Sequence, residues 1–175
     1  MKIQIIGYSG SGKSTLAKQL SHHYQIPLLY LDRVQFYDCW KERSLEQQNE
    51  IVTEFLNTHQ DWVIDGNYGK VAPERFQQCD IMIYLNYNRF YCFFKAFQRY
   101  RKNKGKVRES CPCVEKFDFE FQKWILFEGR TKSQREKHLY HLSQCQGQTY
   151  IFKNRRQLYK FLQKNGIKNN RLNEY

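Results

Sequence analysis

The sequence lacks several features that would assign it to a familiar class of protein. No apolar run approaches the roughly 20 residues that a transmembrane helix needs, so we expect no contact with a membrane. No internal repeat or low-complexity linker divides the 175 residues, which predicts one domain over residues 1–175. Helix-turn-helix, zinc-finger and RNA-binding signatures are also missing. These absences favour a single globular domain.

Export and metal-binding signals are equally scarce. The first two residues lead directly into an apolar stretch, so we expect no secretory segment and a cytoplasmic location. The six cysteines are scattered, as in proteins with reduced thiols. Cys111 and Cys113 supply half of a tetrahedral zinc site, but no second C-x-x-C pair follows. His138 and His141 would complete it only through a long-range contact that nothing in the sequence supports.

A phosphate-binding motif stands near the start of the chain. Residues 7–15 read GYSGSGKST, which fits G-x-x-x-x-G-K-[ST] between an apolar strand and a helical pattern. The glycines allow backbone N–H groups to approach an anion, and the helix start adds further N–H groups. Lys13 is expected to reach the β- and γ-phosphates, and the Ser14 hydroxyl to ligate Mg²⁺. The predicted ATP-binding residues of the motif are Gly7, Ser9, Gly10, Ser11, Gly12, Lys13, Ser14 and Thr15.

Apolar strands alternate with helical patterns along the rest of the chain. Strands are expected at residues 3–6, 28–31, 62–64, 81–85 and 149–152, and helices at 14–24, 44–58, after the fourth strand, and at 156–162. Continuous apolar strands in this alternation indicate an α/β fold whose parallel sheet is covered on both faces. Aromatic residues recur at helical spacing in two segments, and core packing is expected of both. They are Phe90, Phe94 and Phe97, and then Phe117, Phe121, Trp124 and Ile125.

Two aspartates follow predicted strands. Asp32 comes after the second strand and Asp65 after the third, at the carboxyl ends where doubly wound sheets bind ligands. Asp65 is the expected support for Mg²⁺, and Asp32 is expected to orient or deprotonate an acceptor hydroxyl. Capping of a helix or turn is the alternative for both. Gly66 follows Asp65 where many motor ATPases have a water-activating glutamate, which favours transfer to a bound acceptor.

Positive charge is confined to the second half of the chain. Residues 1–98 carry 10 Lys and Arg against 10 Asp and Glu, whereas residues 99–175 carry 19 against 7. Many of these cations lie within or beside the segment 102–116, which we interpret as a mobile lid. A solvated basic surface and a surface for nucleic acid are both open as explanations of this charge.

Three arginines of this half are candidate site residues. Arg99 ends the aromatic helix and Arg135 lies on the helix after the lid, so both are candidates to neutralise charge on a migrating phosphoryl group. Arg155 follows the fifth strand, where it would border an adenine ring or cap the strand.

The chain resembles the small bacterial proteins known as DNA topology modulation proteins of the FlaR type, which are similar to adenylate kinases. The resemblance rests on the phosphate loop and on residues 30–32, 62–68 and 113–118. It implies a three-layer P-loop NTPase fold, a five-stranded sheet in the order 2-3-1-4-5, and a lid after the fourth strand. The magnesium role of Asp65 is implied too. Adenylate kinases continue with Phe-Pro-Arg where this chain has Asn67-Tyr68-Gly69, so AMP is not implied as the acceptor.

The sequence therefore predicts a Mg²⁺- and ATP-dependent kinase that acts on a nucleotide, a nucleoside or a small metabolite. Two alternatives remain open, an ATP-switched protein associated with DNA and a polynucleotide kinase. The identity of the acceptor is not specified, and both a monomer and a homodimer are compatible with the sequence.

Overall fold

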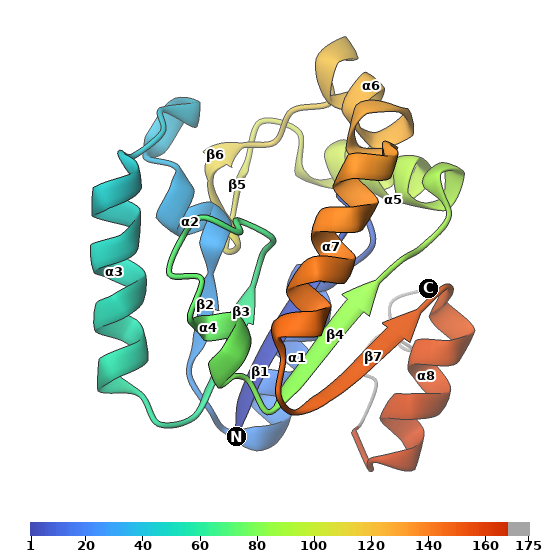
Figure 1. The fold of residues 1–175 in the computed structure, drawn as a ribbon. Helices are drawn as coiled ribbons and strands as arrows, with labels where there is room; N and C mark the ends of the chain where they lie inside the picture. Colours follow the sequence, from blue (N-terminus) through green and yellow to red (C-terminus); the bar gives the residue numbers. More distant parts are fainter. Residues whose placement is uncertain (168–175) are drawn as a thin grey trace.

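The five apolar runs form one parallel sheet in the computed structural model, which describes residues 1–167 (Figure 1). The strands are β1 (Lys2–Gly7), β2 (Leu28–Tyr30), β3 (Trp62–Asp65), β4 (Ile81–Leu85) and β7 (Gln148–Phe152). Their order, β2-β3-β1-β4-β7, confirms the predicted order, because β7 is the fifth strand of this sheet. Residues 168–175, which end the predicted domain and its basic half, lie outside the described residues.

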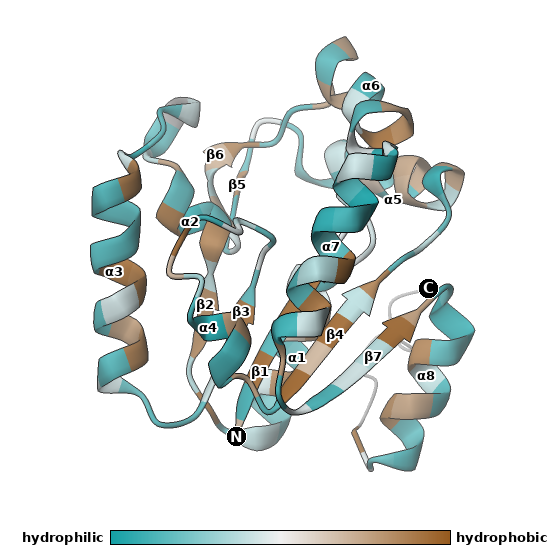
Figure 2. Ribbon diagram, viewed as in Figure 1, coloured by the Kyte–Doolittle hydropathy of each residue, from teal (hydrophilic) through white to brown (hydrophobic). Residues whose placement is uncertain are grey.

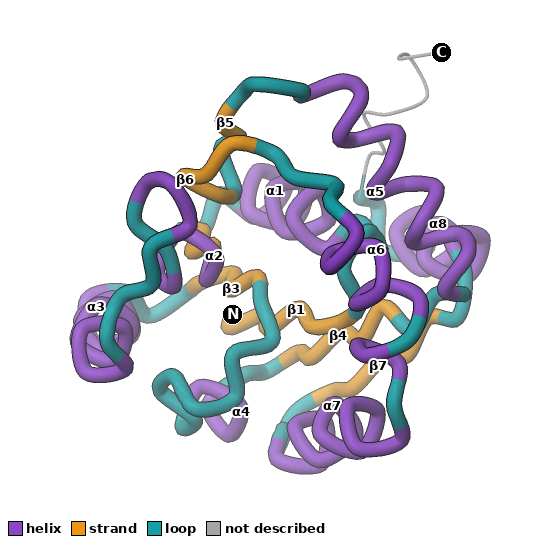
Figure 3. Tube along the Cα trace, turned by 90° about the horizontal axis from the view of Figure 1, so that it is seen from above, coloured by secondary structure: helices purple, strands orange, loops and turns teal. Residues whose placement is uncertain are grey.

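Helices cover both faces of the sheet. In Figure 3, α1 (Lys13–Tyr24) and α8 (Arg155–Lys164) lie on one face, and α4 (Arg75–Gln78) and α7 (Lys132–Gln144) on the other. Figure 2 shows hydrophobic residues on the strands and hydrophilic stretches on α3 (Leu45–Thr58) and α7. This two-sided cover explains why β1, β3 and β4 are buried over nearly their whole length, whereas the edge strand β7 is mostly exposed. Within residues 1–167, no helix combines the length and apolar character needed to cross a lipid bilayer.

The remaining elements lie around the carboxyl ends of the strands and beside β2. They are α2 (Leu31–Gln35), η1 (Asp38–Trp40), α5 (Arg89–Asn103), β5 (Val107–Arg108), β6 (Cys111–Val114), α6 (Phe119–Leu126) and η2 (Glu128–Arg130). The predicted helix at 44–58 is α3, and Ser44 caps it as its sequence suggests. The Ser44 side chain accepts from the Gln47 N–H, and the Gln47 side chain accepts from the Ser44 N–H, both at 3.2 Å.

The second strand is shorter than predicted. It ends at Tyr30, which pairs with Asp65, and Leu31 and Asp32 belong to the first turn of α2. Leu31 is buried, so its apolar side chain fits a strand pattern and a helix pattern equally well. A carboxylate in the first turn of a helix is favoured by the helix dipole, which explains the early switch.

The expectation that the aromatic face of α5 packs in the core is wrong. The side chains of Phe90, Phe94 and Phe97 are exposed, at 70%, 55% and 38%. The buried face of α5 carries the small residues Cys92 and Ala96 instead. Small residues are needed there because α5 packs directly against the phosphate loop. In the second aromatic segment Ile125 is buried and Phe117 and Phe121 pack on the core, whereas Trp124 is 41% exposed.

The predicted lid segment 102–116 contains regular structure. After α5 ends, β5 and β6 pair antiparallel as a short hairpin. This hairpin packs against α2 and η1 on the β2 side of the molecule. Its turn is held there by Glu109, whose carboxylate forms an ion pair with Lys18 and whose carbonyl oxygen accepts from Arg33 at 3.0 Å.

Candidate active site

The phosphate loop adopts the backbone that its glycines allow. Gly10 and Gly12 have φ angles of 80° and 93°, in the left-handed region. A Cβ on Gly10 would lie 2.2 Å from the carbonyl oxygen of Cys92, so only glycine permits the approach of α5. A Cβ on Gly12 would meet nothing within 4 Å, because this residue borders open space at the start of α1. The loop therefore lines open space at the start of α1, an arrangement typical of anion-binding sites.

Lys13 lies between this loop and the two predicted carboxylates. Its Nζ donates a hydrogen bond to the carbonyl oxygen of Tyr8 at 3.1 Å. Burial lowers the pKa of Lys13, although Asp65 and Asp32 act in the opposite direction. The two carboxylates and the Tyr8 carbonyl oxygen offset part of the cost of desolvating this ammonium group.

Asp65 ends β3, directly beside β1, and its side chain faces Ser14. The carboxylate is buried, and its Oδ1 has no hydrogen-bond partner among the described residues. Burial raises the pKa of Asp65 to about 6, against the effects of Lys13 and of a hydrogen bond from Ser14. An unpartnered buried carboxylate oxygen beside a hydroxyl suits a hard cation such as Mg²⁺. The residues Ser14 and Asp65 thus fit the predicted metal.

Asp32 is held by a tyrosine of the neighbouring loop. The Tyr68 hydroxyl donates to Asp32 Oδ1 at 2.7 Å. Burial and the nearby carboxylate of Asp32 both raise the pKa of Tyr68, so the phenol remains a donor. The sequence places Tyr68 just after Asp65, but nothing in it indicates this contact. The pair presents a fixed carboxylate to the cleft.

Asn67 is a site residue that sequence reasoning missed. Its side-chain Nδ2 donates to the Gly7 carbonyl oxygen, and its Oδ1 accepts from the Gly7 N–H, both at 2.9 Å. Beneath this segment, the fully buried Arg75 donates to the carbonyl oxygens of Tyr68 (3.0 Å) and Ala72 (3.1 Å). Arg75 also donates to the Gln4 side chain at 3.1 Å. The loop that follows β3 is therefore rigidly supported.

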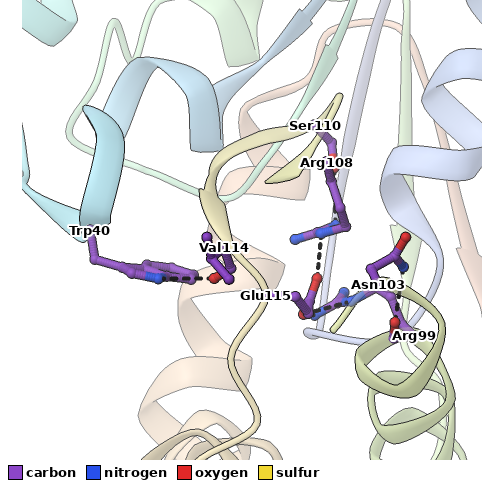
Figure 4. Close-up of polar contacts among 7 residues, drawn as sticks. All are labelled: Trp40, Arg99, Asn103, Arg108, Ser110, Val114 and Glu115. Carbon is purple, nitrogen blue, oxygen red and sulfur yellow. Dashed lines mark hydrogen bonds and ion pairs between the residues drawn. The ribbon is translucent and has the colours of Figure 1, made fainter. Parts of the chain in front are cut away.

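Arg99 points into the cleft as part of a cluster with two further residues that were not predicted as site residues. Its Nε and Nη2 donate to Glu115 Oε1 at 3.0 and 2.7 Å, and Arg108 forms an ion pair with Glu115 Oε2 (Figure 4). Burial and the neighbouring Arg108 lower the pKa of Arg99, whereas Glu115 raises it. The excess of positive charge around residues 102–116 points to Arg108 in the sequence, but no pattern in the sequence points to Glu115.

The two other predicted arginines, Arg155 and Arg135, do not belong to this cluster. Arg155 lines the cleft at the start of α8, with its guanidinium 4.7 Å from the Tyr159 ring. Arg135 is exposed on α7 and does not line the cleft. Arg130 of η2 does approach the phosphate loop. Its guanidinium lies 3.5 Å from the centre of the Tyr8 ring, and Nη1 donates to the Tyr87 carbonyl oxygen at 2.7 Å.

One cleft of about 1030 Å³ joins these groups. Its volume lies at the upper end of the range for small-molecule sites. Gly7 and Arg135 are the predicted site residues that do not line it. The predicted residues that do are Ser9, Gly10, Ser11, Gly12, Lys13, Ser14, Thr15, Asp32, Asp65, Arg99 and Arg155.

The cysteines and histidines considered for zinc lie in different places. Cys111 and Cys113 are buried in β6, where Cys113 Sγ donates to the Tyr37 carbonyl oxygen at 3.3 Å and accepts from the Trp40 N–H at 3.2 Å. His138 stacks on the Tyr84 ring at 5.0 Å on the other side of the sheet. Across residues 1–167, no three His, Cys, Asp or Glu side chains are grouped so as to hold a metal ion.

Comparison with solved structures places the fold among the P-loop kinases. Shikimate kinase from Bacteroides thetaiotaomicron matches with a TM-score of 0.52 and 20% identity, covering 94% of this chain and 95% of that one. Shikimate kinase from Acinetobacter baumannii, in complex with shikimate, has a TM-score of 0.52, 16% identity and 95% coverage of both chains. Deoxyadenosine kinase from M. mycoides has a TM-score of 0.51 and 15% identity, covering 94% of this chain and 98% of that one.

The sequence comparisons add no narrower assignment. No protein-family profile matches the chain, and no curated protein matches it. At these identities the likeness defines the class, a P-loop kinase-like α/β fold, and leaves activity and substrate to the site itself.

Proposed function

We propose that this chain is a Mg²⁺- and ATP-dependent phosphotransferase that acts on a nucleotide, a nucleoside or another small acceptor. One observation carries the proposal. The phosphate loop with Lys13, the Ser14–Asp65 pair and the Tyr68-held Asp32 all face one cleft. A triphosphate, a metal and an acceptor hydroxyl thus find complementary groups within a single site.

Different residues of the chain bind the triphosphate, the metal and the acceptor during phosphoryl transfer. The loop N–H groups and Lys13 bind the β- and γ-phosphates, while Arg155 and Tyr159 border the adenine. Ser14 and Asp65 would hold Mg²⁺, which would neutralise negative charge on the triphosphate. Asp32 orients the acceptor hydroxyl and takes its proton as the acceptor oxygen bonds to the γ-phosphorus. The bond from that phosphorus to the β,γ-bridging oxygen breaks, and ADP leaves.

The water-activating glutamate that motor ATPases carry after this strand is replaced by Gly66. A Cβ on Gly66 would lie 2.7 Å from the Leu31 Cβ, so a larger residue is excluded by packing as well. The β5–β6 hairpin and α6 line the cleft through Arg108, Glu115, Phe121 and Trp124, where they would shield a bound acceptor from water. Both features support transfer over hydrolysis.

An ATP-consumption screen tests the proposal. Purified protein with Mg²⁺ and ATP is assayed for ADP release with panels of nucleosides, nucleoside monophosphates and small hydroxylated metabolites. The K13A variant should lose all activity, because the phosphates lose their ammonium partner. K160A, which removes an exposed lysine on α8, is the matched control and should retain activity. Equal activity of wild type and K13A would contradict the proposal, and so would failure of the wild type to bind Mg²⁺–ATP by calorimetry.

An ATP-switched role on DNA, which the name of the FlaR-type family suggests, is the second candidate, and polynucleotide end phosphorylation would combine the two. The exposed cations Arg101, Lys104 and Lys106 near exposed Phe94 and Phe97 favour it, because ssDNA binding pairs cations with stacking rings. This role would be established if the affinity of the protein for DNA fell steeply as the salt concentration rose and ADP were released only when an oligonucleotide was added. Under either function we propose that residues 1–175 act as one cytoplasmic domain, as a monomer or a homodimer.

A further inference from the structure

Glu115 is a buried carboxylate between two arginines. Its side chain is 3% exposed, against 29% for Arg99 and 17% for Arg108. Arg99 comes from α5 and Arg108 from β5, so Glu115 joins two separate elements at the wall of the cleft (Figure 4). Arg108 is further fixed by Ser110, whose hydroxyl oxygen accepts from its Nη1 at 3.0 Å. The two guanidinium groups are therefore held in place before any ligand binds.

The hairpin that carries Arg108 belongs to the acceptor half of the cleft. The Trp40 indole N–H donates to the Val114 carbonyl oxygen at 3.2 Å, which ties η1 to β6. Trp40 has a φ of 64°, a conformation that a bulky residue keeps only where its surroundings enforce it. These contacts lie beside α2, which carries Asp32, and β2 is the edge strand opposite β7 and α8. The adenine-side residue Arg155 is thus on the far side of the phosphate loop from this cluster.

The cluster carries excess positive charge next to the reacting groups. Two guanidinium groups share one carboxylate, which leaves one positive charge uncompensated within the cluster. Arg99 influences the ionisation of Lys13, and Asp32 influences that of Arg99, while Arg108 influences that of Asp65, so all lie within electrostatic reach. Forked guanidinium groups bind phosphate and carboxylate with paired hydrogen bonds, a geometry that a neutral hydroxyl does not use.

We propose that Arg99 and Arg108, positioned by Glu115, bind an oxyanion on the phosphoryl acceptor. The acceptor is then a hydroxyl compound that carries a phosphate monoester or a carboxylate, and not a neutral nucleoside or polyol. This inference rests on the proposed function and names the substrate class of the same site. Arg99 and Arg108 are the binding groups, and Glu115 is a positioning residue.

A binding experiment tests the site apart from turnover. The phosphate loop is first filled with Mg²⁺ and the non-hydrolysable β,γ-imido analogue of ATP, and inorganic phosphate is then titrated by calorimetry. Wild type should bind one phosphate, and R99Q and R108Q should each weaken it about tenfold or more, as expected for a lost charge-assisted contact. K153Q and K160Q, at exposed lysines that do not line the cleft, should leave it unchanged. Absence of phosphate binding, or unchanged binding in both R99Q and R108Q, would overturn the inference, whereas analogue binding by itself tests the proposed function.

A kinetic comparison identifies the anion and tests the positioning role. Acceptor pairs that differ only by the anionic group are assayed, namely a nucleoside with its monophosphate, a sugar with its phosphate, and a polyol with its hydroxy acid. The anionic member should be the substrate, and which pair responds separates phosphate from carboxylate. R108Q should raise KM for that substrate, and E115Q should raise KM without changing the KM for ATP. The inference would be overturned if wild type preferred the neutral acceptors. It would also be overturned if R108Q lost kcat equally with neutral and anionic acceptors, because the arginines would then contact only the transferring phosphoryl group.

Discussion

The side-chain amide of Asn67 pairs with both backbone polar groups of Gly7, with donor–acceptor distances of 2.9 Å in each direction. Gly7 is the last residue of β1 and the first of the phosphate loop, and Asn67 follows Asp65 by two residues. One amide thus ties the start of the loop to the segment that presents the buried carboxylate of Asp65. The loop and the carboxylate are positioned as one rigid unit.

Replacement of Asn67 should weaken nucleotide binding without unfolding the protein. N67A removes two part-buried hydrogen bonds that together contribute about 1–3 kcal/mol, so Mg²⁺–ATP affinity should fall about tenfold or more. N67D keeps an acceptor for the Gly7 N–H but repels both the Gly7 carbonyl and the triphosphate, so it should be worse than N67A. Calorimetry with Mg²⁺–ATP measures both. N57A, at an exposed asparagine of α3, is the control, and equal affinity of N67A and wild type would contradict this role.

The sequence predicted the parts of the site that lie in one continuous motif. The phosphate loop, the five strands and the position of Asp65 follow from local patterns, because glycine spacing and apolar runs are read within a few residues. Asn67 pairs with Gly7, 60 positions away, and Glu115 pairs with Arg99 on a different element, and such pairings arise only when the sheet and hairpin have formed.

The error on α5 has a different cause. Phe90, Phe94 and Phe97 have the spacing of a buried helix face, but spacing cannot tell which face meets the core. The face that does so must approach the Gly10 backbone closely, and only Cys92 and Ala96 are small enough.

Protonation of Asp65 should weaken nucleotide binding at acidic pH. Burial raises its pKa to about 6, so this carboxylate, the proposed support for Mg²⁺, is protonated as the pH falls through that value. Mg²⁺–ATP affinity at low Mg²⁺ should therefore decline below about pH 6, and the midpoint should move to lower pH at high Mg²⁺, since metal competes with the proton. Calorimetry across pH 4.5–8 measures this.

His138 provides the control for that pH dependence. Burial lowers its pKa to about 4, so the imidazole stays neutral over the range in which Asp65 titrates. The pH midpoint of Mg²⁺–ATP affinity should be the same in H138N as in wild type. D65N should bind Mg²⁺–ATP weakly, and its affinity should no longer decline at acidic pH. If the decline persisted in D65N, another group would have to be the one that titrates.

The same pKa shift predicts that D65N is more stable than wild type without ligand. The folded-state pKa of Asp65 is raised from its ordinary value of 3.8, so between about pH 4 and 6 the folded protein holds a proton that the unfolded chain has released. Stability from this group therefore falls as pH rises through that window, by about 3 kcal/mol when complete. Urea unfolding at pH 7.5 should show D65N stabilised by about 1–3 kcal/mol, and the difference should vanish below pH 4. A destabilised D65N at pH 7.5 would contradict the assignment.

Substitutions on the exposed face of α5 should have little effect on the fold. F94Q removes a side chain that is 55% exposed, so its free energy of unfolding should stay within about 0.5 kcal/mol of wild type. A96Q, two residues away on the fully buried face, should destabilise by about 1–3 kcal/mol because the larger side chain must displace the phosphate loop. Urea titrations of the two variants measure this contrast, and a large loss in F94Q would mean that another surface covers this face.

The Arg99–Glu115–Arg108 cluster should serve binding at the expense of stability. E115A leaves two guanidinium groups facing each other without their carboxylate, and because both are partly exposed we expect a loss of about 2–4 kcal/mol. Replacing all three residues by methionine removes the charges together, so this variant should recover most of that stability. The triple variant should nevertheless fail to bind inorganic phosphate beside the filled nucleotide site. Urea unfolding and phosphate calorimetry on the two variants separate the structural from the binding role. If the triple variant recovered phosphate binding together with stability, the anion would have to bind elsewhere in the cleft.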